Sequence, residues 1–484
     1  MRVRIRDLRF GVSDCPTRLP FRFGINTMTW APTLTARVEL DTDAGSAVGY
    51  AADLLVPKWF EKDPQKSIED DVRGLMASAV AAAQVAQDVG QGEASGEHAE
   101  TVFDLWWRTY QARVHGQPAD ASDRLLRGFG VALVERAVLD ATCRAAGATF
   151  FEALKTDLFG VRPRVLYPEL EGWSLADSLP PTPLSRVALR HTVGLVDALR
   201  TSDIPEGSRV GDGLPEALEE DIAAFGLDWF KLKLCGDAAV DLPRCLAFAE
   251  VLAESAGDDR RITVDGNEQF ESLGSLSAFL EQLGRDPRGA DLLERLTCIE
   301  QPLARAKSLE AGLEPGLAAL SRFAPVILDE ADHGVEALPR ALGLGYGGIS
   351  VKNCKGVLRA LVGRGLCERR GAIQSAEDLT NLGVLALQQD LCTVAALGLP
   401  HVERNGHHYF PGLDHLPGPE ALSAAMTHPT LWSRTKERTT LRIVDGSLDL
   451  TSLQTVGYGY ASEIDWDART PLEDWTFRPP STRP

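Results

Sequence analysis

The sequence contains no long apolar run. No stretch of about 18 consecutive apolar residues, the length of a membrane-spanning helix, occurs anywhere along the chain. Its first residues, MRVRIRDLRF, lack the apolar segment of a secretory signal peptide. We therefore expect a cytoplasmic protein that does not enter a membrane.

Closely spaced cysteine pairs are also absent. The chain has eight cysteines, which are Cys15, Cys143, Cys235, Cys245, Cys298, Cys354, Cys367 and Cys392, and none of them forms a CxxC pair. This spacing argues against a zinc site. Several of these residues lie in apolar, strand-like runs, which is typical of buried free thiols in a reducing compartment.

Positive charge is scarce relative to negative charge. The chain has 50 Lys and Arg residues against 69 Asp and Glu residues, a net charge of −19. This balance argues against binding to nucleic acid or to a membrane surface, but it leaves a small-molecule pocket open. The hydrophobic fraction of 44% and the length of 484 residues suit a globular protein of two or three domains, or one barrel with a cap.

The first part of the chain, residues 1–155, has the pattern of an α+β capping domain. Alternating apolar and polar residues predict strands at 3–12, 33–42 and 44–55. Helical spacing of apolar residues follows at 67–89, 98–112 and 129–147, where Gly147 ends the last helix.

From residue 188 to residue 414, short apolar runs alternate with amphipathic helices. The runs lie at 189–195, 229–234, 262–265, 296–300, 325–329, 348–352, 371–375 and 399–403. Eight buried strands separated by helices predict a parallel (β/α)8 barrel. The Pro-rich segment 156–187 is expected to be a linker or a lid, and residues 415–484 are expected to pack back on the cap.

Charged residues end several of these strands, although barrel strands are expected to be apolar. Lys231 and Lys233 point to the same side of the second strand because they are two residues apart. The next ends carry the acids Asp265, Glu300 and Asp329, and Lys352 ends the sixth strand. The C-terminal ends of barrel strands meet at one mouth, so we expect these side chains to converge there.

Three carboxylates in one mouth would repel one another unless a cation binds between them. An all-oxygen ligand set favours Mg²⁺, with Mn²⁺ as a close alternative. A substrate carboxylate bound to this ion would have a more acidic α-proton, which a neutral lysine could remove. The cation and Lys231 would lower the pKa of Lys233 by repulsion of like charges.

These residues, in this order, resemble the enolase superfamily, whose known chemistry includes a lysine base with magnesium. The closest resemblance is to its muconate-lactonizing-enzyme and dipeptide-epimerase branch, in the mandelate racemase/muconate lactonizing enzyme family. The matching motifs are KLK at 231–233, DGNEQF at 265–270, EQP at 300–302, DE at 329–330 and VKNCKG at 351–356. The resemblance implies that Lys233 and Lys352 are catalytic bases with Lys231 beside them, and that Asp265, Glu300 and Asp329 bind the metal.

The sequence departs from this pattern in three places. Gly356-Val357 replaces the usual Gly-Gly, and strand eight offers only Glu403 in place of the D-x-D of dipeptide epimerases. Strand seven lacks the histidine of the mandelate-racemase branch. A dipeptide substrate and that branch are therefore disfavoured.

Further residues are candidates for substrate contact. Segment 20–30 occupies the place of the family's cap loop, so Phe23 and Met28 are expected to reach the pocket, and Glu403 and His407 are expected near strand eight. Asn267 and Glu330 are candidates as well, although hydrogen bonding behind the metal ligands is the simpler interpretation. By contrast, Glu377 and Asp378 are interpreted as a helix N-terminal pair, and His191 as a core histidine.

The resulting hypothesis is a Mg²⁺-dependent isomerase, a racemase or epimerase that acts on a small-molecule carboxylate. A dehydratase or cycloisomerase on a sugar-acid-like or succinyl-type carboxylate is the alternative, and a non-catalytic barrel is a third possibility. The substrate itself is not specified. We also expect a homo-oligomer, because barrels of this kind are often symmetric assemblies.

Overall fold

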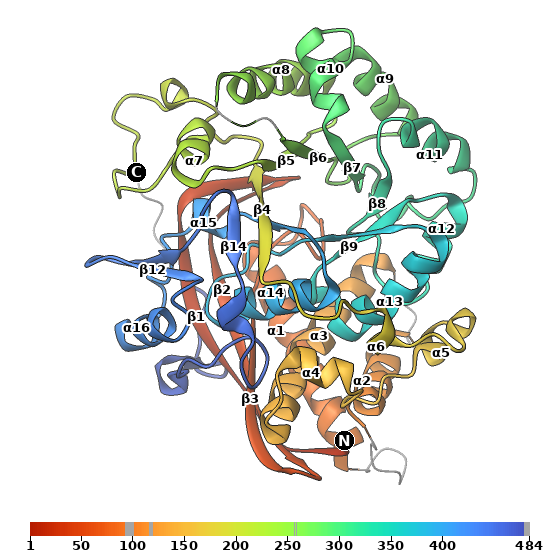
Figure 1. Ribbon diagram of the computed structural model, residues 1–484, viewed down its shortest axis with the longest axis vertical. Coiled ribbons are helices and arrows are strands. Elements are labelled where there is room, and N and C mark those ends of the chain that lie inside the picture. Colours follow the sequence, from red (N-terminus) through yellow and green to blue (C-terminus); the bar gives the residue numbers. More distant parts are fainter. Residues whose placement is uncertain (92–100, 116–119, 256, 258, 479–484) are drawn as a thin grey trace.

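The computed structural model describes residues 1–91, 101–115, 120–255, 257 and 259–478. Residues 98–100, which begin one of the expected helices, and the last six residues of the chain lie outside this description. Figure 1 shows an N-terminal sheet with its helices beside a barrel of strands that is surrounded by further helices. The expected combination of a (β/α)8 barrel and an α+β cap is confirmed.

The cap is an antiparallel sheet covered by helices. Its strands are β1 (Val3–Phe23), β2 (Asn26–Thr42) and β3 (Gly45–Leu54), and its helices are α1 (Ile68–Gln91), α2 (Val102–Tyr110), a π-helical turn (Gln111–His115), α3 (Ala121–Ala146) and α4 (Phe150–Lys155). The segment 20–30, expected in the place of the cap loop, is the end of a hairpin. Phe21 pairs with Met28 in it, and Gly24 adopts the left-handed conformation that a tight turn needs.

Two glycines allow the cap elements to approach closely. A Cβ atom on Gly49 of β3 would lie 2.4 Å from the carbonyl oxygen of Ala137 in α3. A Cβ atom on Gly130 of α3 would lie 2.2 Å from the carbonyl oxygen of Ser78 in α1. Any larger residue at these positions would separate α3 from the sheet or from α1.

Eight parallel strands form the barrel. They are β4 (Arg186–Val193), β5 (Trp229–Lys233), β6 (Arg261–Asp265), β7 (Leu296–Glu300), β8 (Val326–Leu328), β9 (Gly348–Val351), β10 (Ile373–Ala376) and β11 (His401–Arg404). Each strand pairs with the next one, and β11 pairs with β4, which closes the barrel. All eight strands expected from the sequence are present.

Helices follow the barrel strands and cover their outer side (Figure 1). They are α7 (Leu218–Phe225), α8 (Ala238–Glu254), α9 (Leu273–Leu283), α10 (Pro287–Glu294), α11 (Glu314–Ser321), α12 (Ala337–Leu344), α13 (Val357–Arg370), α14 (Leu385–Leu397) and α15 (Gly406–Tyr409). Because the helices bury the outer face and side chains fill the inner face, the strands carry few exposed residues.

The segment between cap and barrel lies along α13. It contains α5 (Pro163–Leu166), a 3₁₀ turn (Pro168–Leu170) and α6 (Leu175–Ser178). Arg364 of α13 donates to the carbonyl oxygen of Ser178, and Trp173 donates to the carboxylate of Glu368. These contacts hold the segment against the outer layer of helices.

The C-terminal part joins both units. It contains α16 (Gly418–Thr427), β12 (Trp432–Arg434), β13 (Thr439–Leu441), β14 (Ser447–Asp449) and β15 (Thr470–Pro471). Strand β14 pairs antiparallel with barrel strand β4, and β15 pairs with cap strand β1. The segment therefore extends the barrel sheet as well as the cap sheet.

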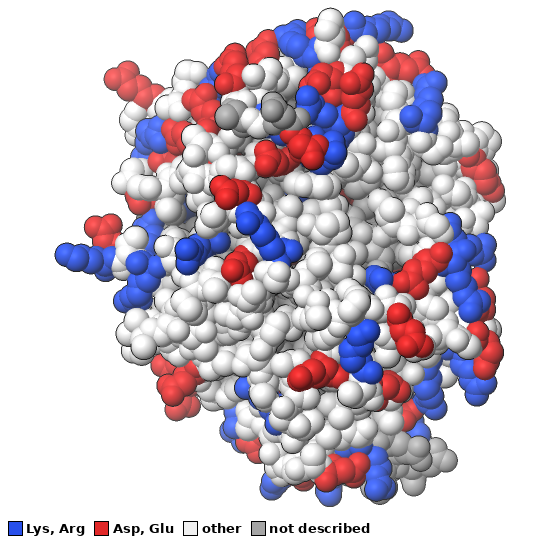
Figure 2. Space-filling model, viewed as in Figure 1, with Lys and Arg blue, Asp and Glu red and all other residues white. Residues whose placement is uncertain are grey.

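The surface and the cysteines agree with a globular protein. All eight cysteines are free, and seven of them are buried. Among the helices that the structure describes, none combines the length and apolar character of a bilayer crossing. Figure 2 shows acidic and basic side chains interspersed around a broad area with few charges on this face.

Candidate active site at the barrel mouth

The ends of β5, β6 and β7 bring charged side chains into one layer. Lys233 is aligned with Asp265, which is aligned with Glu300, so the three residues lie side by side at the carboxyl ends of adjacent strands. Phe230 and Leu232 point to the helices, and Lys231 and Lys233 therefore point into the barrel. The mouth expected from the sequence is present at this end of the barrel.

Lys231 lies at the centre of a group of carboxylates. Its Nζ lies 2.6 Å from Glu300, 2.9 Å from Glu377 and 3.0 Å from both Asp265 and Glu403. Its side chain is fully buried. Lys231 therefore compensates negative charge below the mouth, and only Lys233 and Lys352 of the three lysines line the open cavity above it.

Lys233 and Lys352 face the same cavity from different sides. They come from the second and the sixth of the eight barrel strands, positions that lie across the barrel from each other. The Nζ of Lys233 donates to Asp265 Oδ2 at 2.6 Å, and the Nζ of Lys352 donates to Asp329 Oδ2 at 2.6 Å. Each lysine is thus fixed by a carboxylate, and Lys352 also lies 4.9 Å from the ring centre of Trp59 in the cap.

The carboxylates of Glu300, Asp329 and Glu377 each have an oxygen within 4.8 Å of the others. Asp265 is linked to Glu300 through the shared ammonium of Lys231. The interpretation of Glu377 and Asp378 as a helix N-terminal pair is wrong. Both are buried directly after β10, and the next helix begins only at Leu385.

This donor set fits a hard divalent cation. All of its ligand atoms are carboxylate oxygens, and Oε1 of the buried Glu300 has no hydrogen-bond partner. Burial raises the pKa of Glu300, and the carboxylates of Asp265 and Glu377 raise it further, to well above its ordinary value. A site where negative charge is this unfavourable gains most from a bound cation.

The lysines hold other acids of the mouth in the ionised form. Burial opposes ionisation of Asp329, but Lys352 and Lys355 outweigh it, and the pKa of Asp329 lies well below its ordinary value. Burial likewise opposes the charge on Lys352, but Asp329 and Glu377 hold the pKa of this lysine well above its ordinary value. Lys352 and Asp329 are therefore an ion pair in this state of the protein.

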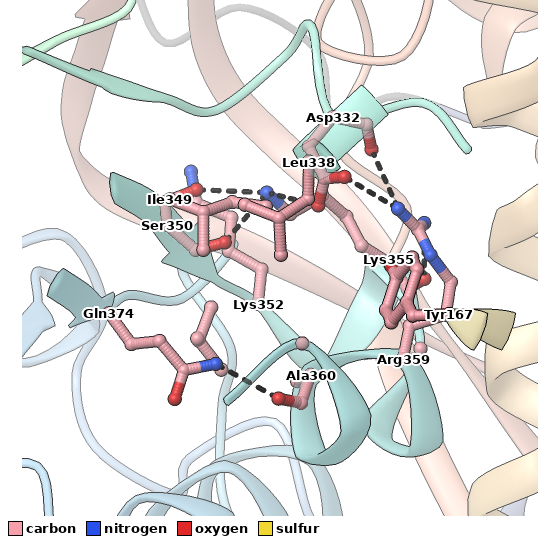
Figure 3. A pocket seen from close by; sticks show the side chains of 13 residues that line it. Tyr167, Asp332, Leu338, Ile349, Ser350, Lys352, Lys355, Arg359, Ala360 and Gln374 are labelled. Carbon is pink, nitrogen blue, oxygen red and sulfur yellow. Dashed lines mark hydrogen bonds and ion pairs between the residues drawn. The ribbon is translucent and has the colours of Figure 1, made fainter. Parts of the chain in front are cut away.

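A second layer of charged side chains supports these acids from behind. Arg190 of β4 donates to Glu377 at 2.7 Å, and Lys355 lies 3.3 Å from Asp329 Oδ1. Figure 3 shows Lys355 next to Ser350, with Asp332 pointing toward Arg359 in the pocket behind β9. Asp329 is consequently contacted by Lys352 at the mouth and by Lys355 from the side of its strand that faces the helices.

The cap closes the mouth with apolar side chains. Phe21, Phe23, Val56 and Trp59 line the cavity together with Lys233, Lys352, Asp378, Leu379, Thr380, Glu403 and Asn405. Of the two cap residues expected at the pocket, Phe23 is therefore present. Met28 is buried and is not among the residues that line this cavity.

Asn267 and Glu330 lie beside the acids of the mouth. The backbone N–H of Asn267 donates to Asp265 Oδ1 at 2.8 Å, and its side chain lies 3.4 Å from Glu330. Lys62 from the cap binds Glu330 at 3.1 Å and Glu268 at 2.6 Å. Neither Asn267 nor Glu330 is among the residues that line the cavity.

His407 lies on the opposite side of the strand wall. Its Nε2 is 3.0 Å from Nδ1 of His191, whose neighbours Arg190 and Thr192 bind Glu377 and Glu403 inside the barrel. His191 and His407 therefore lie between β4 and the outer helices, and His407 does not reach the mouth.

Two positioning residues of the mouth, Glu377 and Lys62, were missed by sequence reasoning. Glu377 follows the seventh strand, and the rule that selected the acids of strands three to five applies to it as well. Lys62 lies in a cap loop, where sequence spacing gives no indication that it will reach Glu330.

Comparisons with proteins of known structure identify the type of fold. No protein-family model matches the chain, and no curated protein matches it by sequence. A muconate lactonizing enzyme from Pseudomonas fluorescens, solved with muconolactone, shows 16% identity, a TM-score of 0.60 and coverage of 96% of this chain and 98% of the other. The fold is that of the mandelate racemase/muconate lactonizing enzyme group.

Two further solved structures agree with this assignment. A dipeptide epimerase from Enterococcus faecalis V583, solved with Mg and the dipeptide L-Leu-L-Tyr, shows 13% identity and a TM-score of 0.60, with coverage of 95% of this chain and 99% of the other. A mandelate racemase/muconate lactonizing protein from Herpetosiphon aurantiacus shows 15% identity and a TM-score of 0.59, with the same coverage of 95% and 99%. Identities this low establish the shared fold.

Proposed function

We propose that this chain is a metal-dependent enzyme that removes the proton from the carbon next to a carboxylate, and that it is a racemase or epimerase. The observation that carries the proposal is the position of Lys233 and Lys352, which line one cavity from the second and the sixth barrel strands. A carbon atom held between two amines can lose a proton to one and receive a proton from the other, which inverts its configuration. Solved structures of this fold include a dipeptide epimerase and an N-succinyl Arg/Lys racemase, which supports the assignment.

The cation of this enzyme would be held by Asp265, Glu300 and Asp329, with Glu377 close to them. We propose Mg²⁺, because the donors are all oxygen atoms. When bound, such an ion supplies a positive charge that stabilises an enolate formed from a substrate carboxylate. The protein's own contribution is to hold Asp329 ionised through Lys352 and Lys355 and to exclude water with the aromatic residues of the cap.

The cavity indicates a small substrate with an apolar part. Phe21, Phe23 and Trp59 cover it on the cap side, whereas Thr380 and Asn405 offer polar atoms on the barrel side. A small carboxylate with an apolar substituent toward the cap fits this distribution.

Each lysine has one defined task in this scheme. Lys233 is held by Asp265, and Lys352 is held by Asp329, so each Nζ has a fixed position from which to exchange a proton with the substrate carbon. In an elimination or cycloisomerisation, one lysine would move the proton and the other would act through its charge. Solved structures of this fold include a muconate lactonizing enzyme, so the product decides between these reactions.

The test is incubation of the protein with a library of chiral carboxylates in D₂O with Mg²⁺, followed by NMR and chiral chromatography. We expect deuterium at the α-carbon of one substrate class, together with loss of optical purity. Loss of a leaving group or ring formation instead would identify the lyase or cycloisomerase reaction. The control is the double variant K233A/K352A, and equal exchange by this variant, or no exchange with any carboxylate, would refute the proposal.

A further inference from the structure

A second group of potential metal ligands lies outside the barrel mouth. It consists of His191 on β4, Asp221 on α7, and His407 and His408 on α15, and we call it the histidine cluster. One ligand atom each of His191, Asp221 and His407 lies within 4.8 Å of the other two. These residues are far apart in the sequence, and they meet because α7 and α15 both pack on the outer face of β4.

The contacts within the cluster are short but poorly matched as hydrogen bonds. Nδ1 of His408 lies 2.8 Å from Oδ2 of Asp221, yet neither carboxylate oxygen of Asp221 makes a hydrogen bond of normal geometry. Nδ1 of His191 lies 3.0 Å from Nε2 of His407, and Nδ1 of His407 has no partner. Nε2 of His191 lies 3.9 Å from Oδ2 of Asp221. Ligands that share a tetrahedral ion with bonds of 2.0–2.1 Å lie about 3.3 Å apart, which falls between this distance and the 3.0 Å that separates His191 from His407.

One oxygen of the buried carboxylate of Asp221 has no partner. The residue is 1% exposed, and its Oδ2 forms an ion pair with His408, whereas its Oδ1 has no hydrogen-bond donor. A buried carboxylate oxygen without a donor is unfavourable, and a bound cation would satisfy it.

The cluster has a route to the outside. His407 is only half-buried, and it lines a cavity together with Leu214, Phe225 and Leu441. This cavity is distinct from the one at the mouth, with which it shares none of its lining residues. An ion could enter here without passing the lysines of the mouth.

We propose that His191, His407 and Asp221 form a site for a transition-metal dication of the Zn²⁺ type. Nitrogen donors select such ions over Mg²⁺, so this site and the acids of the mouth bind different metals. The absence of CxxC pairs argued against a zinc site, and the ligands proposed here are histidines and an aspartate. The bound ion fastens α7 and α15 to β4. Helix α15 begins directly after Asn405, which lines the cavity at the mouth.

The test uses Co²⁺ as a spectroscopic probe on the full-length protein after removal of metals by chelation. A tetrahedral or five-coordinate Co²⁺ ion with nitrogen ligands gives an intense visible absorption band, whereas an octahedral ion bound only by oxygen gives a weak one. We expect the intense band in the wild type, with displacement by Zn²⁺. We expect H407Q and D221N to weaken Co²⁺ binding by more than the roughly 10–100-fold that loss of an outer-shell partner causes.

Two variants separate this site from other sources of the signal. E300Q removes an acid of the mouth, and H115Q removes an exposed histidine elsewhere, so both should keep the band. If E300Q loses the band while H407Q keeps it, the ion binds in the mouth and the proposal is wrong. A folded wild type that shows no intense band would also overturn it. H407Q changes a half-buried residue, and its circular dichroism spectrum shows whether it has folded.

Discussion

Replacement of Lys231 by methionine tests how the charges of the mouth compensate one another. Lys231 is fully buried, and its ammonium contacts Asp265, Glu300, Glu377 and Glu403 at 2.6–3.0 Å. Methionine has a similar length and no charge, so K231M leaves four carboxylates without their shared partner. Removal of one member of a buried ion pair costs about 3–5 kcal/mol, and we expect a loss of that size in the free energy of unfolding.

The same variant should respond differently to pH and to Mg²⁺. Without Lys231, the pKa values of Asp265, Glu300 and Glu403 are higher in the folded variant than in the folded wild type. The folded variant then binds more protons than the folded wild type, so K231M should gain stability relative to the wild type as the pH falls from about 7 to about 5. Mg²⁺ supplies the missing positive charge, and it should therefore stabilise K231M more than the wild type.

Urea unfolding followed by circular dichroism measures these effects at pH 7 and pH 5, with and without Mg²⁺. K307M is the matched control, because Lys307 is an exposed lysine of the same size, and we expect it to change the stability by less than about 0.5 kcal/mol. A K231M protein as stable as K307M at pH 7 would refute the account of charge compensation.

Three further predictions concern other parts of the molecule. E377Q should weaken Mg²⁺ binding by roughly 10–100-fold in calorimetry, whereas E368Q on exposed Glu368 should not; equal affinities would remove Glu377 from the cation site. Burial raises the pKa of Glu135 to about 7, so its ionisation destabilises the folded state as the pH rises from about 4.5 to about 7. E135Q should remove this part of the stability loss. Identical pH–stability curves for the variant and the wild type would contradict the assignment. G49A brings a methyl group within 2.4 Å of the α3 backbone and should cost about 1–3 kcal/mol in urea unfolding, whereas G343A on α12 meets no atom within 4 Å and should not destabilise; a neutral G49A would show that the sheet can move away from α3.

The sequence was informative about the fold because the barrel has a regular pattern. Each strand is a short run of buried apolar residues between helices, and a charge at the end of such a run stands out, as for Asp265 and Glu300. The same regularity could have identified Glu377, but an acid pair also matches the first turn of a helix. Only the three-dimensional arrangement shows that α14 begins eight residues later.

Contacts between distant segments were beyond sequence reasoning. Lys62 reaches Glu330 across the boundary of cap and barrel, and no periodicity indicates that contact. His407 was expected near the substrate because it follows the eighth strand, but α15 turns it to the outer face of β4 toward His191. The direction of a side chain after a strand end depends on local turns, and sequence patterns rarely determine such turns.

The most direct test of the two-lysine account is hydrogen–deuterium exchange by the single variants K233A and K352A, measured on each enantiomer of the substrate in D₂O. We expect each variant to exchange the α-proton of one enantiomer only, with opposite preference, and to lose racemisation by about 100- to 10,000-fold. If both variants exchange the same enantiomer, or both exchange as the wild type does, Lys233 and Lys352 do not act from opposite faces of the substrate.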